Sequence, residues 1–348
     1  MKTGRLLQFV TLSSVATVLV LAAALPASAQ WTPVPDVPAT ILYSVWANGD
    51  TMVATADSVV YVSTNGGLAW KGSATVAAGA YVVSAARLHN GRLYAGTFGQ
   101  GAFVSDNLGD TWIGFNQGLV GGFQDSQLKI ADLVMSGNEL YAATGGDGAW
   151  RRDLAGGTWS RFGDIFEPSQ AANVGSITVG GTRLLACAGT NGTVYFRDPG
   201  DSDWTESLLK NVVLSPGTGP FTAIFTGSRW VVGTNTGAYH SVQGQSPWTF
   251  VNVGLGPQVN VVFAIRQPVV FASFGTSLFA NIEYSLDDGA SWQVLDTLPA
   301  VFVFGLATHD NTLYAARLDG LWQRSIATVA AKPTSWGSLK ALYRKPGK

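Results

Sequence analysis

Short apolar runs alternate with turn-forming residues along most of the chain. Seven of these runs are almost continuously apolar, as in strands that are buried on both faces. They cover residues 43–47, 82–88, 130–135, 174–179, 222–226, 259–265 and 303–307. Helix has little support, because no long segment has apolar residues spaced by three and four. The pattern predicts seven inner strands of an all-β protein.

A second apolar run follows each inner strand and ends in small residues. The seven copies cover residues 52–55, 93–97, 140–144, 185–189, 230–234, 270–273 and 313–316. Most are followed by a turn rich in Gly, Asn or Asp, such as Gly146-Asp147-Gly148, and then by a third apolar run. Such composition is typical of hairpin turns. Each repeat is therefore expected to form an antiparallel sheet.

A turn motif closes the best-preserved repeat, in the sequence Ser285-Leu-Asp-Asp-Gly-Ala-Ser-Trp292. Asp can hydrogen-bond its own backbone two residues on, and Gly tolerates positive φ. Weaker copies recur, and their tryptophans are about 42 to 47 residues apart, the period of propeller blades. The positions that keep the pattern are Ser63, Asn65, Gly67, Trp70, Ser105, Asn107, Gly109, Trp112, Gly156, Trp159, Trp204, Trp248, Ser285, Asp287, Gly289 and Trp292.

The motif resembles the Asp-box, or BNR repeat, of sialidases, sortilin-type receptors, some xyloglucan hydrolases and photosystem II assembly factors. The resemblance covers roughly residues 31–325. It implies a seven-bladed β-propeller of four-stranded antiparallel blades, in which the box lies at an outer hairpin tip and is structural. It implies little about function.

The last repeat lacks a box, so its outer strand must come from elsewhere. Trp31-Thr-Pro-Val-Pro35 reads as an outer strand without a blade of its own, and proline is tolerated there. We expect this N-terminal strand to complete the seventh blade, which removes an exposed edge. The alternative is closure by Trp336, which lies 44 residues beyond Trp292.

The first 29 residues have the features of a secretory signal. Lys2 and Arg5 precede an apolar stretch, and Ala27-Ser28-Ala29 is a small-residue cleavage site. We therefore expect a signal peptide at 1–29, a propeller at 30–331 and a basic tail at 332–348. The protein should work in the periplasm or outside the cell.

Composition and charge narrow the function. Of 21 basic residues, two lie in the signal and five in the tail, which leaves 14 in the body against all 22 acidic residues. An acidic body argues against a nucleic-acid partner. The single cysteine, Cys187, lies in an apolar run and is expected to be a buried small hydrophobe. No cofactor or metal motif is present, and we expect a monomer.

The resemblance also implies where a ligand would bind, namely over the axis, on the rim that carries the turns after each second strand. The polar candidates there are Gln100, Asp147, Asn191, Asn235, Arg317 and Asp319.

Two function classes remain open at this point. The favoured one is non-catalytic recognition of a protein or a glycan. The alternative is a glycosidase, which would need two facing carboxylates, such as Asp147 and Asp319, or, if sialidase-like, an arginine cluster. Only Arg317, Arg266 and Arg87 could approach the axis. The two classes are separated by which of these groups converge in the axial pocket.

Overall fold

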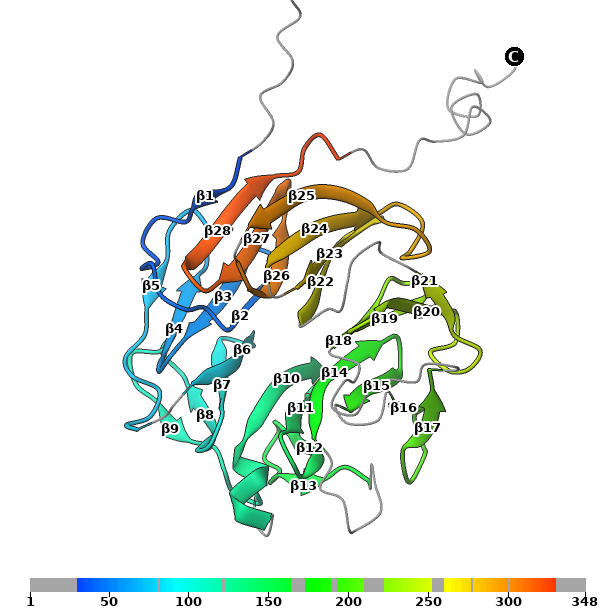
Figure 1. Ribbon diagram of the computed structural model, residues 1–348. Helices are drawn as coiled ribbons and strands as arrows, with labels where there is room; N and C mark the ends of the chain where they lie inside the picture. The colour runs from blue at the N-terminus through cyan, green and yellow to red at the C-terminus, as the bar shows by residue number, and fades with distance from the viewer. Residues whose placement is uncertain are drawn as a thin grey trace, which may run out of the picture.

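The computed structural model describes residues 30–79, 82–119, 123–163, 173–188, 193–209, 222–251, 260–276, 278–299 and 301–329. Within these ranges the strands form seven sheets of four antiparallel strands each, and Figure 1 shows them as blades around a ring. The one helical element there is a short 3-10 turn, η1 (Phe123–Leu128). The predicted all-β, seven-bladed propeller is therefore confirmed.

The first three blades have short outer strands. Blade 1 contains β2 (Ser44–Asn48), β3 (Thr51–Ala56), β4 (Val59–Ser63) and β5 (Lys71–Gly72). Blade 2 contains β6 (Val83–His89), β7 (Arg92–Thr97), β8 (Gly101–Ser105) and β9 (Ile113–Gly114). Blade 3 contains β10 (Ile130–Ser136), β11 (Glu139–Thr144), β12 (Gly148–Asp153) and β13 (Ser160–Arg161).

The next three blades follow the same order. Blade 4 contains β14 (Val174–Gly180), β15 (Arg183–Ala188), β16 (Thr193–Arg197) and β17 (Thr205–Leu208). Blade 5 contains β18 (Thr222–Phe225), β19 (Trp230–Thr234), β20 (Gly237–Ser241) and β21 (Thr249–Val251). Blade 6 contains β22 (Asn260–Arg266), β23 (Val269–Gly275), β24 (Phe279–Ser285) and β25 (Gln293–Pro299).

Blade 7 joins the two ends of the propeller. Its strands are β26 (Val303–His309), β27 (Thr312–Arg317), β28 (Gly320–Ser325) and the N-terminal β1 (Thr32–Pro33). Thr32 pairs with Gln323 and Pro33 with Trp322, and β1 lies beside β28 in Figure 1. The predicted closure by the N-terminal strand is confirmed.

Strand direction gives the ring two different rims. The turns between first and second strands lie on one rim together with the hairpins between third and fourth strands. The turns between second and third strands lie on the opposite rim, together with the connections between blades, and we call this the crossing rim. The inner strands begin there, so their first residues surround the axis at this end.

Four inner strands carry a β-bulge at their second residue. The register shifts fall between Val83 and Ala85, Ile130 and Asp132, Val174 and Ser176, and Val303 and Gly305. The extra residues are Ser84, Ala131, Gly175 and Phe304. A bulge re-aims the side chains around it, so these strands depart from simple alternation at the crossing rim.

Apolar side chains fill the space between neighbouring blades. One cluster joins Tyr94 and Val104 of blade 2 to Ile130, Leu133 and Leu140 of blade 3, all of them buried. Similar clusters link other neighbours around the ring, so each blade depends on both adjacent ones. In the part of the chain that the structure describes, no helix is long and apolar enough to cross a membrane.

Candidate functional site

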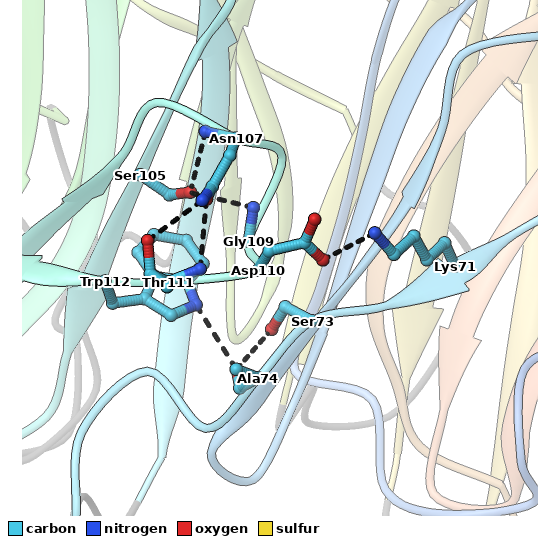
Figure 2. A network of polar contacts seen from close by, with 9 residues as sticks. All are labelled: Lys71, Ser73, Ala74, Ser105, Asn107, Gly109, Asp110, Thr111 and Trp112. Carbon is cyan, nitrogen blue, oxygen red and sulfur yellow. Dashed lines mark hydrogen bonds and ion pairs between the residues drawn. The ribbon is translucent and has the colours of Figure 1, made fainter.

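The hairpins between third and fourth strands of blades 1, 2 and 6 each contain the same pattern of side-chain hydrogen bonds. We call them the box hairpins. In blade 2, shown in Figure 2, Ser105 Oγ donates to Asn107 Oδ1 at 2.8 Å and accepts the backbone N–H of Gly109 at 2.8 Å. Asn107 Oδ1 accepts the N–H of Thr111 at 3.0 Å. Side chains of the turn itself thus accept hydrogen bonds from the backbone N–H groups of Gly109 and Thr111.

Asp287 plays the same part in blade 6. Its Oδ1 accepts the backbone N–H of Ser291, four residues on, at 2.8 Å, and its Oδ2 accepts the Ser291 hydroxyl at 2.6 Å. Burial by itself raises the pKa of this carboxyl, but the hydrogen bonds from Ser291 and Ser285 favour the charged form and bring the pKa below its ordinary value. The carboxylate is therefore committed to the turn.

Tryptophans in the third-to-fourth-strand connections of blades 2, 3, 4 and 5 bond each of these blades to the one before it. Their indole N–H groups donate to atoms of the preceding blade's outer segment. The pairs are Trp112 to Ala74 O at 3.2 Å, Trp159 to Phe115 O at 2.7 Å, Trp204 to Phe162 O at 2.6 Å and Trp248 to Ser207 Oγ at 2.9 Å. Figure 2 shows the first pair beside an ion pair between Lys71 and Asp110. These contacts hold neighbouring blades together.

A separate cavity lies on the propeller axis and is lined by residues from or next to all seven inner strands. It encloses about 320 Å³. Its polar lining comprises Ser44, Ser84, Arg87, Asp132, Ser176, Thr222 and Asn260. Aromatic walls are added by Tyr43, Phe263 and Phe304. Three of the four bulge regions contribute a polar side chain: Ser84, Asp132 and Ser176.

The charged groups of this axial cavity pair with each other. Arg87 Nη2 lies 3.0 Å from Asp132 Oδ1, and its Nη1 donates to the carbonyl of Ala86 at 2.9 Å. Asp132 also accepts the N–H groups of Leu133 at 2.8 Å and Ile177 at 3.4 Å. The pair therefore links blades 2, 3 and 4.

Burial disturbs both members of this pair. It lowers the pKa of Arg87 and raises the pKa of Asp132, in each case against the attraction of the partner's opposite charge. One ion pair and a few hydrogen bonds therefore do not fully replace the water that these groups lose. Additional hydrogen-bond donors near Asp132 would favour its charged form.

Several other polar groups of the cavity are already engaged. Ser84 Oγ donates toward the carbonyl of Ile130 at 2.5 Å, and Asn260 Nδ2 donates to the carbonyl of Val303 at 2.5 Å. Ser176 differs, because its buried hydroxyl oxygen has no oxygen or nitrogen partner among the described residues and lies near the Cys187 thiol. It is 7 % exposed. Such an orphaned group in a cavity is a point at which a ligand can bond.

The candidate residues from the sequence lie around the cavity but not in it. Gln100, Asp147, Asn235 and Asp319 occupy turns after second strands, and Arg317 ends β27. None of these five is among the described residues that line the axial cavity. Asn191 lies outside the described residues.

Two of these side chains, Gln100 and Asp147, bond to groups outside the cavity. Gln100 donates to the carbonyl of Ala78 at 3.0 Å, in the connection between blades 1 and 2. Asp147 accepts the indole N–H of Trp150 at 3.2 Å and lies 3.8 Å from a guanidinium nitrogen of Arg161. Burial raises the pKa of Asp147, with these two partners opposing the shift.

Of the remaining candidates, Arg317 and Asp319 bond to each other, whereas Asn235 has a side-chain oxygen without a partner among the described residues. Arg317 makes two bonds of 2.9 Å to Asp319, and its guanidinium lies 4.2 Å from the ring centre of Trp322 in its own blade. Asn235 is buried, and its side-chain oxygen finds no partner among the described residues.

The arrangement does not provide the glycosidase constellations considered from the sequence. Among the described residues, the axial lining contains one arginine, Arg87, and one carboxylate, Asp132, which are bonded to each other. Arg266 instead bonds to Asn311 Oδ1 at 2.6 Å on the other rim. No group of three or more His, Cys, Asp or Glu in the described ranges could hold a metal ion.

Asp132, Ser176 and Asn260 were not among the sequence candidates. A signal was present, because Asp132 interrupts the apolar run 130–135 and Arg87 interrupts 82–88. A charged residue in a strand buried between blades has to face the axis or a partner. The bulges that present Ser84 and Ser176 leave no comparable mark in the sequence.

Comparison with known proteins supports the fold. No family profile and no curated protein matches the sequence. Among solved structures, YCF48 bound to D1 peptide is 12 % identical, with a TM-score of 0.65, over 86 % of this chain and 97 % of that chain. YCF48 from Cyanidioschyzon merolae is also 12 % identical, with a TM-score of 0.63, over 86 % and 99 %.

A third similar structure is a chain from the mitotic checkpoint complex. It is 14 % identical, with a TM-score of 0.63, over 92 % of this chain and 98 % of that chain. At these identities the likeness concerns the propeller fold alone.

Proposed function

We propose that this chain is an exported, non-catalytic propeller of the Asp-box type that binds a segment of another protein on its crossing rim, over the axial cavity. The observation that carries the proposal is the cavity itself. All seven blades contribute to it, and its one described arginine and one described carboxylate neutralise each other. Such a site is suited to binding and lacks a free acid and base for hydrolysis.

Exposed apolar side chains on the crossing rim support a protein partner. Phe98, Leu278 and Leu318 are 46 %, 73 % and 38 % exposed, and they lie in the turns after second strands of blades 2, 6 and 7. Apolar and aromatic residues around a cavity are typical of protein-binding surfaces. A partner segment crossing the rim would cover them.

The similar structures and the N-terminal sequence give further support. YCF48 was solved with a D1 peptide, so a propeller of this shape can hold a peptide in that protein. Residues 1–29 have the features of a cleaved signal, and we place the mature chain in the periplasm or outside the cell on that basis. The box hairpins serve stability in this proposal.

The test is selection of binding peptides from a random display library by the immobilised chain without residues 1–29. We expect selected peptides to lose at least about tenfold in affinity for Phe98→Ser and Leu278→Ser, because each change removes apolar contact area. Leu68→Ser is the control, since Leu68 is 85 % exposed in the box hairpin of blade 1, on the other rim.

Equal binding by all three variants would contradict the proposal. So would a glycosidase activity of the wild type that Asp132→Asn abolishes without unfolding the protein, because that carboxylate would then act in catalysis.

A further inference from the structure

The axial cavity contains hydrogen-bond acceptors that the protein satisfies weakly. Arg87 gives one N–H to Asp132 and one to the carbonyl of Ala86, and Asn260 gives one amide N–H to the carbonyl of Val303. Asp132 Oδ2, in contrast, receives one long bond of 3.4 Å. The Ser176 hydroxyl has only the weakly bonding Cys187 thiol beside it, and no oxygen or nitrogen partner among the described residues. A ligand that donates hydrogen bonds would satisfy these atoms.

The mouth of the cavity adds aromatic rings and a negative charge. The rings of Tyr43 and Phe304 lie 6.1 Å apart at the cavity wall. Asp57 lies in the turn after β3, close enough for its charge to act on Tyr43. Burial, and then the charge of Asp57, raise the pKa of Tyr43, so its hydroxyl stays protonated. Electron-rich rings beside a carboxylate favour a cation.

Elsewhere on the described crossing rim, carboxylates are in excess over basic side chains, which include Lys129. Asp147 and Asp319 are paired with arginines. Asp36, Asp57 and Asp125 are exposed, and no described basic side chain forms an ion pair with any of them. A rim with unpaired carboxylates concentrates cations near the cavity mouth.

We propose that the axial cavity binds a lysine or arginine side chain of the partner segment, which passes beside the ring pair of Tyr43 and Phe304 and donates to Asp132 and Ser176. This inference rests on the proposed function and specifies what the partner carries. The cavity of about 320 Å³ is large enough for one extended side chain but not for a folded element. The rim would then hold the flanking residues of the segment.

An alternative occupant is an anionic group that takes Arg87 from Asp132. The cavity disfavours it, because Asp132 would be left as a buried, unpaired carboxylate and Asp57 would repel the ligand at the mouth. A cation, in contrast, adds an opposite charge beside Asp57 and can bond to Oδ2 of Asp132 while Oδ1 keeps Arg87. The two occupants predict opposite charge preferences, which an experiment can separate.

The experiment compares capped pentapeptides with Lys, Arg, norleucine or Glu at the centre of an otherwise all-glycine sequence. Their binding to the chain without residues 1–29 is measured by NMR titration, which detects weak binding. We expect the Lys and Arg peptides to bind about tenfold or more tightly than the norleucine peptide, with the difference shrinking at high salt.

Two variants locate the site. Asp57→Asn removes the mouth charge, and Asn tolerates the positive φ of 36° that Asp57 adopts. Asp132→Asn keeps the side-chain shape. We expect each to weaken the Lys peptide about fivefold or more while the norleucine peptide changes little. The control is Asp106→Asn, an exposed residue on the other rim that is paired with Arg92 at 2.6 Å. Circular dichroism melts show which variants remain folded, and Asp57→Asn alone suffices if Asp132→Asn does not.

Three outcomes decide whether the inference and the proposed function hold. The inference is supported if the Lys and Arg peptides bind more tightly than the others and if Asp57→Asn, together with Asp132→Asn where that variant folds, weakens this binding. Equal binding of all four peptides, or preference for Glu, overturns it, while library peptides that depend on Phe98 would still support the proposed function. If no library peptide binds the rim at all, the proposed function itself fails.

Discussion

At the scale of single residues, Glu283 is a carboxyl group enclosed between blades. It lies in β24, is 2 % exposed, and accepts a long hydrogen bond of 3.4 Å from Asn281. Burial raises its pKa to about 7 from an ordinary value of 4.5, with the Asn281 bond opposing the shift. The folded state therefore holds this proton at a pH where the unfolded chain releases it.

This predicts that Glu283 makes the protein less stable as pH rises from about 4.5 to about 7, because the unfolded state binds fewer protons there. The full effect is up to about 3 kcal/mol. Glu283→Gln removes the charge and should be more stable than the wild type at pH 8, with little difference at pH 4.5. Urea unfolding at both pH values measures this.

Glu206→Gln, on the exposed β17, is the control and should show no such pH-dependent gain. If Glu283→Gln is equally or more destabilised at pH 8 than at pH 4.5, the carboxyl is not the buried neutral acid described above.

Trp292 gives a second prediction at this scale. Its ring lies 5.4 Å from Phe274 and 6.1 Å from Phe263, in a cluster that reaches Val231 of blade 5. Trp292→Ala should lower the free energy of unfolding by about 3 kcal/mol, because it leaves a cavity between blades 5 and 6. The melting temperature should fall, while peptide affinity of the folded variant stays unchanged.

A loss of peptide binding at unaltered stability would assign Trp292 to the ligand site instead. The same comparison tests the structural interpretation of the box hairpins as a group.

At the scale of elements, the strand positions were predictable and the bulges were not. The inner strands begin and end within about two residues of the predicted runs, since apolar runs and glycine-rich turns mark them. A bulge adds one residue to such a run without changing its composition. The side chains of Ser84 and Ser176 could therefore not be assigned to the axis from alternation alone.

The candidate site was predictable only in part for the same reason. Topology placed Asp147 and Asp319 in turns of the crossing rim. It could not show that each is held by an arginine of its own blade, because that depends on side-chain direction and not on strand order. Asp132 was overlooked because a single charged residue in an apolar strand was treated as part of the core pattern.

Close packing of second strands against the next blade gives a third prediction. A Cβ at Gly233 in β19 would lie 2.2 Å from Cγ1 of Val261 in β22, so Gly233→Ala should force the two blades apart. We expect a loss of about 1 to 3 kcal/mol in unfolding free energy. Gly114→Ala in β9 is the matched control, because nothing lies within 4 Å of its added Cβ.

Chemical denaturation of both variants measures the difference. Equal stabilities would mean that blades 5 and 6 can move apart without loss, contrary to tight packing between second and inner strands.

At the scale of the whole molecule, the ring is closed by hydrogen bonds between segments almost three hundred residues apart. Beyond the β1–β28 pairing, the N–H of Val34 donates to the carbonyl of Leu321 at 2.8 Å, and Val34 is buried against blade 7. A ring of packed blades is stable when every blade has two neighbours, so closure affects all seven.

This leads to a comparison of two truncations of the chain without residues 1–29. Removing residues 30–36 deletes β1 and leaves blade 7 with three strands, with the edge of β28 unpaired. Exposed strand edges promote aggregation, and the lost pairing also takes away the buried side chain of Val34. We expect a clear drop in melting temperature and in soluble yield.

Removing residues 334–348 should have a much smaller effect, because this basic segment lies outside the repeats. The pairing of β1 with β28 is formed by residues outside this segment. Soluble yield and melting temperature of the two truncated proteins, measured side by side, test the ranking. The reverse ranking would mean that Trp336 contributes more to closure than β1 does, and equal small losses would mean that the ring holds without either segment.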